Sequence, residues 1–243
     1  MFIDRAHLDA DDLPGGQWPS TVPAVAALHG RGLEFTRPVT ILVGENGSGK
    51  STLVEAIAEQ FGLDAEGGRL SVPGGNRDIP KSELGQVLRL RHTAAGERMR
   101  RAPRLQRKGF FLRAETAVLT QQRFSQALGY WPEDTEVISH GEGFKAMISA
   151  MMDGPGLFVL DEPESALSFT SCLELVGRIY ALAESGAQVV CATHSPILAG
   201  TPGAQIIELG EDGFRYVEWE ELRLVDHWRR FLDDPYTYTQ HFL

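Results

Sequence analysis

A glycine-rich stretch, GENGSGKST at residues 44–52, restricts the fold more than any other part of the sequence. It follows the β-branched apolar run VTILVG, which predicts a short buried parallel strand. The segment after it, LVEAIAEQFG, has apolar residues at helical spacing and a glycine that ends the helix. A strand, a glycine-rich turn and a helix in this order favour an α/β domain with a mainly parallel sheet.

The residue types in this turn predict a phosphate site. Gly44, Gly47 and Gly49 allow the backbone to curl so that its N–H groups point inward, and the start of the helix adds partial positive charge. Lys50 is expected to reach the β- and γ-phosphates of a nucleotide, and the Ser51 hydroxyl is placed to bind Mg²⁺. The other residues of the predicted nucleotide-binding loop are Glu45, Asn46, Ser48 and Thr52.

Two further motifs follow predicted strands in the second half of the chain. In LFVLDEPE, an apolar run delivers Asp161 and Glu162 to the carboxyl end of a strand, where open α/β sheets bind their ligands. We expect Asp161 to hold Mg²⁺ through water, and Glu162 to act as the general base that orients an attacking water. In VVCATHSP, His194 follows another strand and is expected within reach of a γ-phosphate.

The rest of the sequence predicts strands and helices without an internal repeat. FTSCLELVGRIYALAESG predicts a helix, AQIIELG and FRYVEWE a hairpin, and the segment from Glu220 an amphipathic helix with an aromatic tail. QVLRLRH, RMRRAP and KGFFLRA predict strands, and residues 1–37 predict short strands and loops. Cys172 and Cys191 lie in apolar segments, which favours two buried reduced thiols.

Hydropathy and charge narrow the class of protein. No apolar run approaches the ~20 residues of a membrane helix, and the acidic start lacks the apolar region of a signal peptide, so we expect a cytoplasmic protein without a membrane segment. The net charge is −10, yet residues 89–113 hold nine Lys or Arg residues and one acid. The acidic remainder is typical of a poor general nucleic-acid binder, while the basic segment is either a solvated ribbon or a phosphate or partner surface.

The glycine-rich loop, LDEPE, SALS and THSP, in this order and spacing, resemble the motifs of ATP-binding-cassette (ABC) ATPases. ENGSGKS and DEPESALS are closer to the heads of SMC and recombination-repair ATPases than to transporter subunits. More narrowly, FFLRAE, SHGEGF, LDEPE, ATHSPIL and FLDDP resemble a family of small stand-alone bacterial predicted ATPases. The resemblance implies ATP and Mg²⁺ as ligands, and hydrolysis of ATP to ADP and phosphate.

The resemblance also implies an architecture: a single ABC-type P-loop NTPase domain over residues 1–243, with a central mainly parallel sheet. We expect its parts to be a small antiparallel β lobe at 1–37 and 84–113, a helical lobe at 114–150, a nucleotide core at 38–63 and 151–215, and a C-terminal helix and tail at 216–243.

In ABC-type ATPases a signature loop precedes the acidic strand at the distance where this chain has SHGEG. The resemblance implies that this loop contacts the ATP of a second copy, so that a homodimer encloses two nucleotides. The residues of this predicted contact are Ser139, His140, Gly141, Glu142 and Gly143.

Three positions depart from the family pattern. Ser168 stands where many relatives have Asp. Where relatives have a glutamine near the metal, this chain has Arg113 and Glu115, and Gln121 and Gln122 come later. Gln121 is the candidate for that glutamine, and the alternative is that Arg113 contacts phosphate. No aromatic residue is evident as the adenine platform, because Trp18 and Phe35 are expected in the core.

ATP hydrolysis leaves the biological task open. The residues found in the motifs favour a nucleotide-driven dimer that acts as a switch on a protein or nucleic-acid partner. The alternative is the nucleotide-binding subunit of an ABC transporter, and a third interpretation is a scaffold that binds ATP without hydrolysing it. Only 111 residues separate Lys50 from Asp161, which excludes the long coiled coil of a complete SMC protein.

Overall fold

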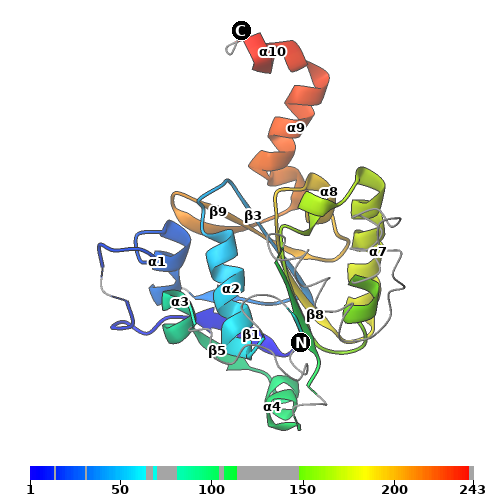
Figure 1. Ribbon diagram of the computed structural model, residues 1–243. Coiled ribbons are helices and arrows are strands. Elements are labelled where there is room, and N and C mark those ends of the chain that lie inside the picture. The colour runs from blue at the N-terminus through cyan, green and yellow to red at the C-terminus, as the bar shows by residue number, and fades with distance from the viewer. Residues whose placement is uncertain are drawn as a thin grey trace, which may run out of the picture.

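A computed structural model of the chain (Figure 1) describes residues 1–13, 15–30, 32–63, 81–103, 107–113 and 148–240, and the backbone of 68–69. Its centre is a seven-stranded sheet with the order β10-β9-β3-β8-β7-β6-β4, in which the five strands from β9 to β6 run parallel. β10 and β4 pair antiparallel at the two edges. These strands are β3 (Val39–Gly44), β4 (Gly68–Arg69), β6 (Gly109–Arg113), β7 (Leu157–Asp161), β8 (Gln188–Thr193), β9 (Gln205–Gly210) and β10 (Gly213–Val217).

Strand β8 lies between β3 and β7. All three are buried along nearly their whole length, which explains their continuous apolar sequences. Because the strands are parallel, the turns that follow β3, β7 and β8 meet at one edge of the sheet, and these turns carry the predicted phosphate loop, the acidic pair and His194.

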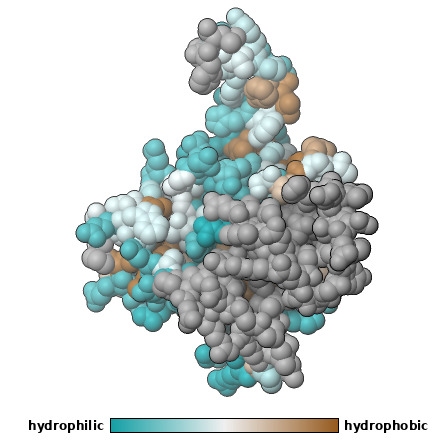
Figure 2. All heavy atoms as spheres, viewed as in Figure 1, coloured by the Kyte–Doolittle hydropathy of each residue, from teal (hydrophilic) through white to brown (hydrophobic). Residues whose placement is uncertain are grey.

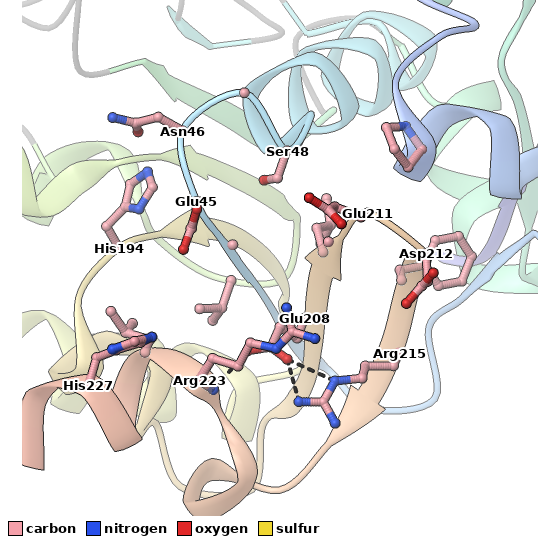
Figure 3. A pocket seen from close by; sticks show the side chains of 18 of the residues that line it. Glu45, Asn46, Ser48, His194, Glu208, Glu211, Asp212, Arg215, Arg223 and His227 are labelled. Atoms are coloured by element: carbon pink, nitrogen blue, oxygen red, sulfur yellow. Dashed lines mark hydrogen bonds and ion pairs between the residues drawn. The ribbon is translucent and has the colours of Figure 1, made fainter. Parts of the chain in front are cut away.

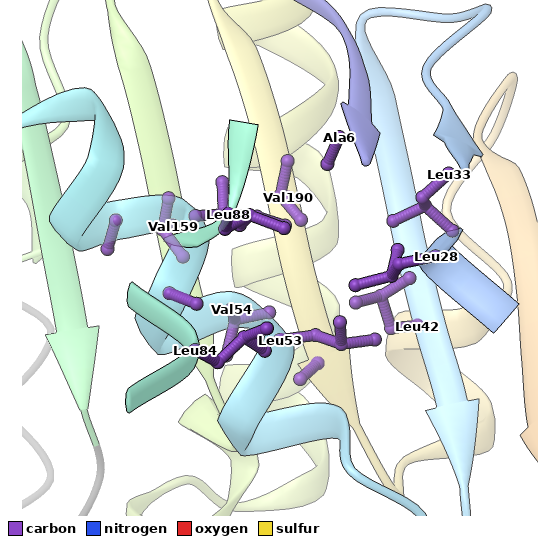
Figure 4. Close-up of a cluster of buried hydrophobic side chains, with 14 of the residues drawn as sticks. Ala6, Leu28, Leu33, Leu42, Leu53, Val54, Leu84, Leu88, Val159 and Val190 are labelled. Atoms are coloured by element: carbon purple, nitrogen blue, oxygen red, sulfur yellow. The ribbon is translucent and has the colours of Figure 1, made fainter. Parts of the chain in front are cut away.

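Helices cover both faces of the sheet. Successive side chains of each strand point to opposite faces, so Leu42 and Val190 pack with Leu53 on one face (Figure 4), while Ile41 and Cys191 belong to the cluster on the other. The first face is covered by α1 (Pro23–Gly30), α2 (Lys50–Phe61) and α3 (Glu83–Val87), and the second by α7 (Phe169–Glu184), α8 (Pro196–Ala199) and the start of α9 (Arg223–Asp233). The expected α/β fold with a mainly parallel sheet is therefore present.

A second, antiparallel sheet of three strands has the order β2-β1-β5. Its strands are β1 (Ile3–His7), β2 (Leu33–Glu34) and β5 (Arg89–His92). The side chain of Gln188, at the start of β8, joins the two sheets: its Oε1 accepts from the N–H groups of Phe2 (2.6 Å) and Ile3 (2.9 Å), and its Nε2 donates to the Ile3 carbonyl (2.8 Å). Gln188 is completely buried, so these bonds satisfy an amide that has no access to water.

Three predictions about local structure were wrong. RMRRAP, predicted as a strand, lies mostly in helix α4 (Ala94–Arg101), which begins where the Thr93 hydroxyl accepts from the Gly96 N–H at 3.2 Å. KGFFLRA does form a strand, but β6 pairs in parallel with β7, so it belongs to the central sheet and not to the antiparallel lobe expected over 84–113. Residues 23–30, expected among strands and loops, form α1.

Two other expectations concern single residues. Phe35 is buried, as predicted, but Trp18 is 58% exposed and does not belong to the core. Cys172 and Cys191 are both free and buried, which confirms the prediction of two reduced thiols. Among the described residues, no helix combines the length and the apolar character needed to cross a membrane.

The chain ends in a C-terminal arm, residues 223–239, made of α9 and α10 (Pro235–Thr239), which follows the short 3₁₀ turn Trp219–Glu221. The arm projects from the body of the molecule at the top of Figure 1. Val225 packs into the core, but Trp228, Leu232 and Tyr236 are 44%, 70% and 67% exposed, and apolar side chains are visible on the projecting part in Figure 2. The amphipathic helix predicted from Glu220 is present, with much of its apolar side uncovered.

Candidate nucleotide-binding site

The loop after β3 has the backbone that its glycines predict. Gly47 and Gly49 have φ angles of 80° and 94°, in the left-handed region that favours glycine. At Gly44 a Cβ would lie 2.7 Å from the Leu209 carbonyl oxygen, and at Gly49 it would lie 2.6 Å from the Val22 Cγ1. Helix α2 begins at Lys50 directly after this loop, so the positive end of a 12-residue helix faces the same edge of the sheet.

Lys50 is almost completely buried, with 3% of its surface exposed. Its Nζ donates to the carbonyl oxygens of Gly44 (2.8 Å) and Glu45 (3.0 Å), so the ammonium group lies across the loop. Burial lowers the pKa of Lys50, while the nearby carboxylates of Glu162 and Asp161 act in the opposite direction.

Ser51 follows β3 and Asp161 ends β7, and although β8 lies between these strands in the sheet, the two side chains are in contact. The Ser51 hydroxyl donates to Asp161 Oδ1 at 3.0 Å, and only 5% of Asp161 is exposed. Burial raises the pKa of Asp161 to about 6, with a smaller increase from Glu162, while the hydrogen bond from Ser51 opposes the shift. A hydroxyl and a carboxylate oxygen this close are the hard donors that Mg²⁺ prefers. The described residues contain no group of three His, Cys, Asp or Glu side chains that could hold a metal ion.

Glu162 and His194 form a second pair at this edge. Glu162 Oε1 lies 3.1 Å from His194 Nε2, and each side chain remains about one third exposed. Glu162 has a φ angle of 48°, the one positive φ of a non-glycine residue in the described ranges. Its N–H donates to the Ala192 carbonyl at 2.9 Å, which holds the backbone in this unfavourable conformation.

Glu164 also belongs to the site, although the motif analysis assigned it no role. Its Oε1 accepts from the Thr193 hydroxyl (2.6 Å) and from the His194 N–H (2.5 Å). The sequence signal was its position three residues after Asp161, in a 3₁₀ turn (Pro163–Ala166), but the contact depends on the neighbouring position of β8 and could not be read from the sequence.

The other residues that the sequence analysis assigned to the site either lie outside the described residues or make contacts other than those expected. Residues 139–143 and Gln121 lie outside the described residues, as does most of the helical lobe expected at 114–150. Arg113, considered as a phosphate contact, lies opposite Asp161 in the sheet register, and its Nη1 is 3.1 Å from Glu55 Oε1 on α2. Ser168 caps helix α7, where its hydroxyl accepts from the Ser171 N–H.

A cleft of about 890 Å³ opens beside the phosphate loop (Figure 3). Its walls are residues 44–48 of the loop, the turn between β9 and β10, and the C-terminal arm. Glu208 holds two of these walls together: its Oε2 accepts from Arg215 Nε at 2.8 Å, and its Oε1 accepts from the Arg223 N–H at 2.9 Å. The arm therefore starts from a position fixed relative to the nucleotide loop.

The family matches and the curated relatives of this chain agree with one another on the class of protein. A family described as "AAA domain" matches residues 25–95, and a family described as "AAA domain, putative AbiEii toxin, Type IV TA system" matches residues 134–200. ABC transporter G family member 25 of Arabidopsis thaliana is 30% identical over 171 residues, which cover 64% of this chain and 26% of that protein. ABC transporter G family member STR2 of Medicago truncatula is 26% identical over 182 residues, which cover 65% of this chain and 24% of that protein.

The matched region thus spans about a quarter of the length of these curated relatives. Among solved structures, one titled "Structure of ATP binding subunit of ABC transporter" superposes with a TM-score of 0.48 and 18% identity over 98% of this chain and 99% of that chain. The two family matches and the curated relatives support an ABC-type P-loop ATPase domain, with the phosphate loop in the first match and the acidic turn and His194 in the second.

Proposed function

We propose that the chain binds ATP with Mg²⁺ and hydrolyses it to ADP and phosphate. The observation that carries the proposal is the convergence of three turns at one edge of the sheet, where Lys50, Asp161 and Glu162 come together beside the start of α2. Few other reactions need a buried cation, a pair of Mg²⁺ donors and an exposed carboxylate around one glycine-rich loop.

Each residue then has a task that follows from its position. The N–H groups of residues 47–50 and the positive end of α2 bind phosphate oxygens, and Lys50 turns its ammonium from loop carbonyls to phosphate. Ser51 and Asp161 hold Mg²⁺, which neutralises charge on the phosphates when bound. Glu162 is exposed enough to contact water and accepts its proton, while His194, 3.1 Å away, donates to phosphate or orients that water.

We further propose that two copies enclose the nucleotides, with residues 139–143 of one copy against the phosphates of the other, and that this pairing acts as a switch on a protein or nucleic-acid partner. The residues of the motifs, and the position of the partly exposed Glu162 and His194 at one edge of the sheet, support this arrangement. Binding that favours the paired state would let hydrolysis return it to the separated state.

The second candidate is the nucleotide-binding subunit of an ABC transporter. It is favoured by the names of the curated relatives, which are transporters 26–30% identical to this chain. Purification from native cells distinguishes the two: a membrane protein that copurifies in fixed ratio favours transport, and a soluble protein or nucleic acid favours the switch.

The first experiment uses Glu162→Gln in the full chain. We expect phosphate release to stop while ATP binding persists, and light scattering to find a dimer with ATP and Mg²⁺ and a smaller species without them. Lys50→Ala is the control that should lose ATP binding and pairing together. Multiple turnovers by Glu162→Gln would reject Glu162 as the base, and a constant monomer would reject the pairing.

A further inference from the structure

The turn that follows β7 is joined at two points to the end of β8 and to the turn after it. At the first, the Glu162 N–H donates to the Ala192 carbonyl at 2.9 Å. At the second, the Glu164 carboxylate accepts from the Thr193 hydroxyl and from the His194 N–H. Pro163, between Glu162 and Glu164 in the sequence, is buried, so the turn that carries the proposed base is fastened to the segment that carries the histidine.

Glu164 contacts Thr193 and His194, and a further hydrogen bond from Ser195 joins the residue after them. The Thr193 hydroxyl that donates to Glu164 also accepts from the Ser195 N–H at 2.9 Å. The Ser195 hydroxyl in turn accepts from Leu198 at the start of α8. One carboxylate oxygen therefore holds Thr193 and His194, and through the Thr193 hydroxyl it also helps to hold Ser195, so it fixes the point from which the His194 side chain leaves the backbone.

The second oxygen of Glu164 indicates that this arrangement is more than a packing device. In the described part of the chain, Oε2 is buried and has no hydrogen-bond partner. A buried carboxylate oxygen without a partner opposes folding, and such a group in a folded protein calls for an explanation other than stability.

We propose that Glu164 is a positioning residue for ATP hydrolysis, which holds the His194 turn so that the imidazole stays beside Glu162. The proposal rests on the proposed function, since it gives Glu164 a part in the same reaction. Glu164 acts through the two hydrogen bonds at Oε1, by the place of that oxygen and not by its charge.

Two substitutions distinguish the effect of the position of the Glu164 oxygen from the effect of its charge. Glu164→Gln removes the charge but keeps an acceptor oxygen in place, and we expect kcat to stay within about fivefold of the wild type, because neutral hydrogen bonds are weaker than charge-assisted ones. Glu164→Asp keeps the charge but withdraws the oxygen by about 1.5 Å. Here we expect kcat to fall on the order of 10²-fold, the scale of a small misplacement of a catalytic group.

The affinity for ATP should be nearly unchanged in both variants, because the phosphate loop is not altered. Glu184→Gln, the same substitution at an exposed position at the end of α7, is the matched control and should behave like the wild type. Equal losses in Glu164→Gln and Glu164→Asp, or a loss of ATP affinity that matches the loss of kcat, would overturn the proposal.

A second measurement does not depend on turnover. In NMR spectra of labelled protein, the His194 amide proton should resonate downfield in the wild type and in Glu164→Gln, and move upfield in Glu164→Asp. If the wild type binds ATP but releases no phosphate, the proposed hydrolysis fails, and this amide signal still decides whether Glu164 holds the turn. An unmoved His194 signal in Glu164→Asp would refute the positioning claim whatever the activity.

Discussion

Two regions of the molecule depart from the rule that charged side chains are exposed and large apolar side chains are buried. They are the C-terminal arm and the edge of the central sheet that carries Lys50, Asp161 and Glu162, called here the nucleotide edge. At the edge, Lys50 and Asp161 are 3% and 5% exposed, and both are charged residue types. On the arm, Trp228 and Leu232 are 44% and 70% exposed, although both are large and apolar. At the edge, hydrogen bonds to loop carbonyls hold Lys50, and a hydrogen bond from Ser51 on α2 holds Asp161. On the arm, the ring of Phe231 contacts those of Trp228 and Tyr238.

This contrast shows which side chains lower the free energy of unfolding or add little to it. Burying a charge opposes folding, so neutral substitutions at the edge should stabilise the protein while they abolish its chemistry. An exposed apolar side chain contributes little to folding, so its removal from the arm should leave the free energy of unfolding almost unchanged. The two regions thus predict different responses to mutation.

The largest effect is expected for Asp161→Asn. Loss of a proposed Mg²⁺ donor should reduce phosphate release by about 10²–10³-fold. The free energy of unfolding at pH 8 should rise by about 1–3 kcal/mol, because the substitution removes a buried charge whose pKa burial has raised to about 6. Denaturant unfolding and a phosphate assay measure the two effects. Asp153→Asn, at a side chain that is 73% exposed, is the control that should change neither.

The same carboxyl group predicts a pH dependence. The pKa of Asp161 is about 6 in the folded chain against an ordinary 3.8, so the folded state binds the extra proton between these values. The contribution of Asp161 to stability is therefore lost as the pH rises from about 4 to about 6, by up to about 3 kcal/mol. The difference in unfolding free energy between Asp161→Asn and the wild type should grow over this window and stay constant above it. A constant difference from pH 4 to pH 8 would mean that burial does not raise this pKa.

Glu208 lies where the two regions meet, and its replacement should have a smaller effect. Glu208→Ala leaves the Arg223 N–H without its acceptor and removes the partner of Arg215. We expect a loss of about 1–3 kcal/mol in unfolding free energy and faster hydrogen exchange in α9, with ATP affinity retained. Glu211→Ala, in the exposed turn beside it, is the comparison and should cost nothing measurable. Equal stability of the two variants would show that Glu208 does not fasten the arm.

The smallest effects should occur on the arm itself. Leu232→Ala should change the unfolding free energy by less than about 0.5 kcal/mol, because this side chain is already in water. Val225→Ala, two turns earlier and 2% exposed, should cost about 1–2 kcal/mol through loss of buried methyl groups. A cost at Leu232 as large as that at Val225 would show that the outer part of the arm is covered in solution, which would end the contrast between the two regions.

Sequence patterns predicted the parts of the fold whose signal is local. The continuous apolar runs gave β3, β7 and β8, the helical spacing gave α2 and α7, and the turn EDG gave the hairpin of β9 and β10. The helix at 94–101 was missed because Gly96 was taken for a turn, although Thr93 offers a helix cap. Pro23, at the first position of α1, was taken for a loop residue, although proline favours that position.

The nucleotide edge was partly predictable for a similar reason. The phosphate loop and the acidic pair carry their chemistry in short motifs, so Lys50 and Asp161 could be named from the sequence. The role of Glu164 depends on which strand lies beside β7, and parallel pairing between segments about thirty residues apart leaves no local signal. The burial of Glu208 likewise needs the arm to begin beside the hairpin, which no motif encodes.

The amide of Gln188 has a mechanical consequence. It fastens the small antiparallel sheet to the first residue of β8, and the same strand ends five residues later at Thr193, directly before His194. Strands β3 and β7 pair with β8 on its two sides, so both ends of β8 belong to one continuous ladder. A molecule that bound the three-stranded sheet would therefore lie against one end of the strand whose other end precedes His194.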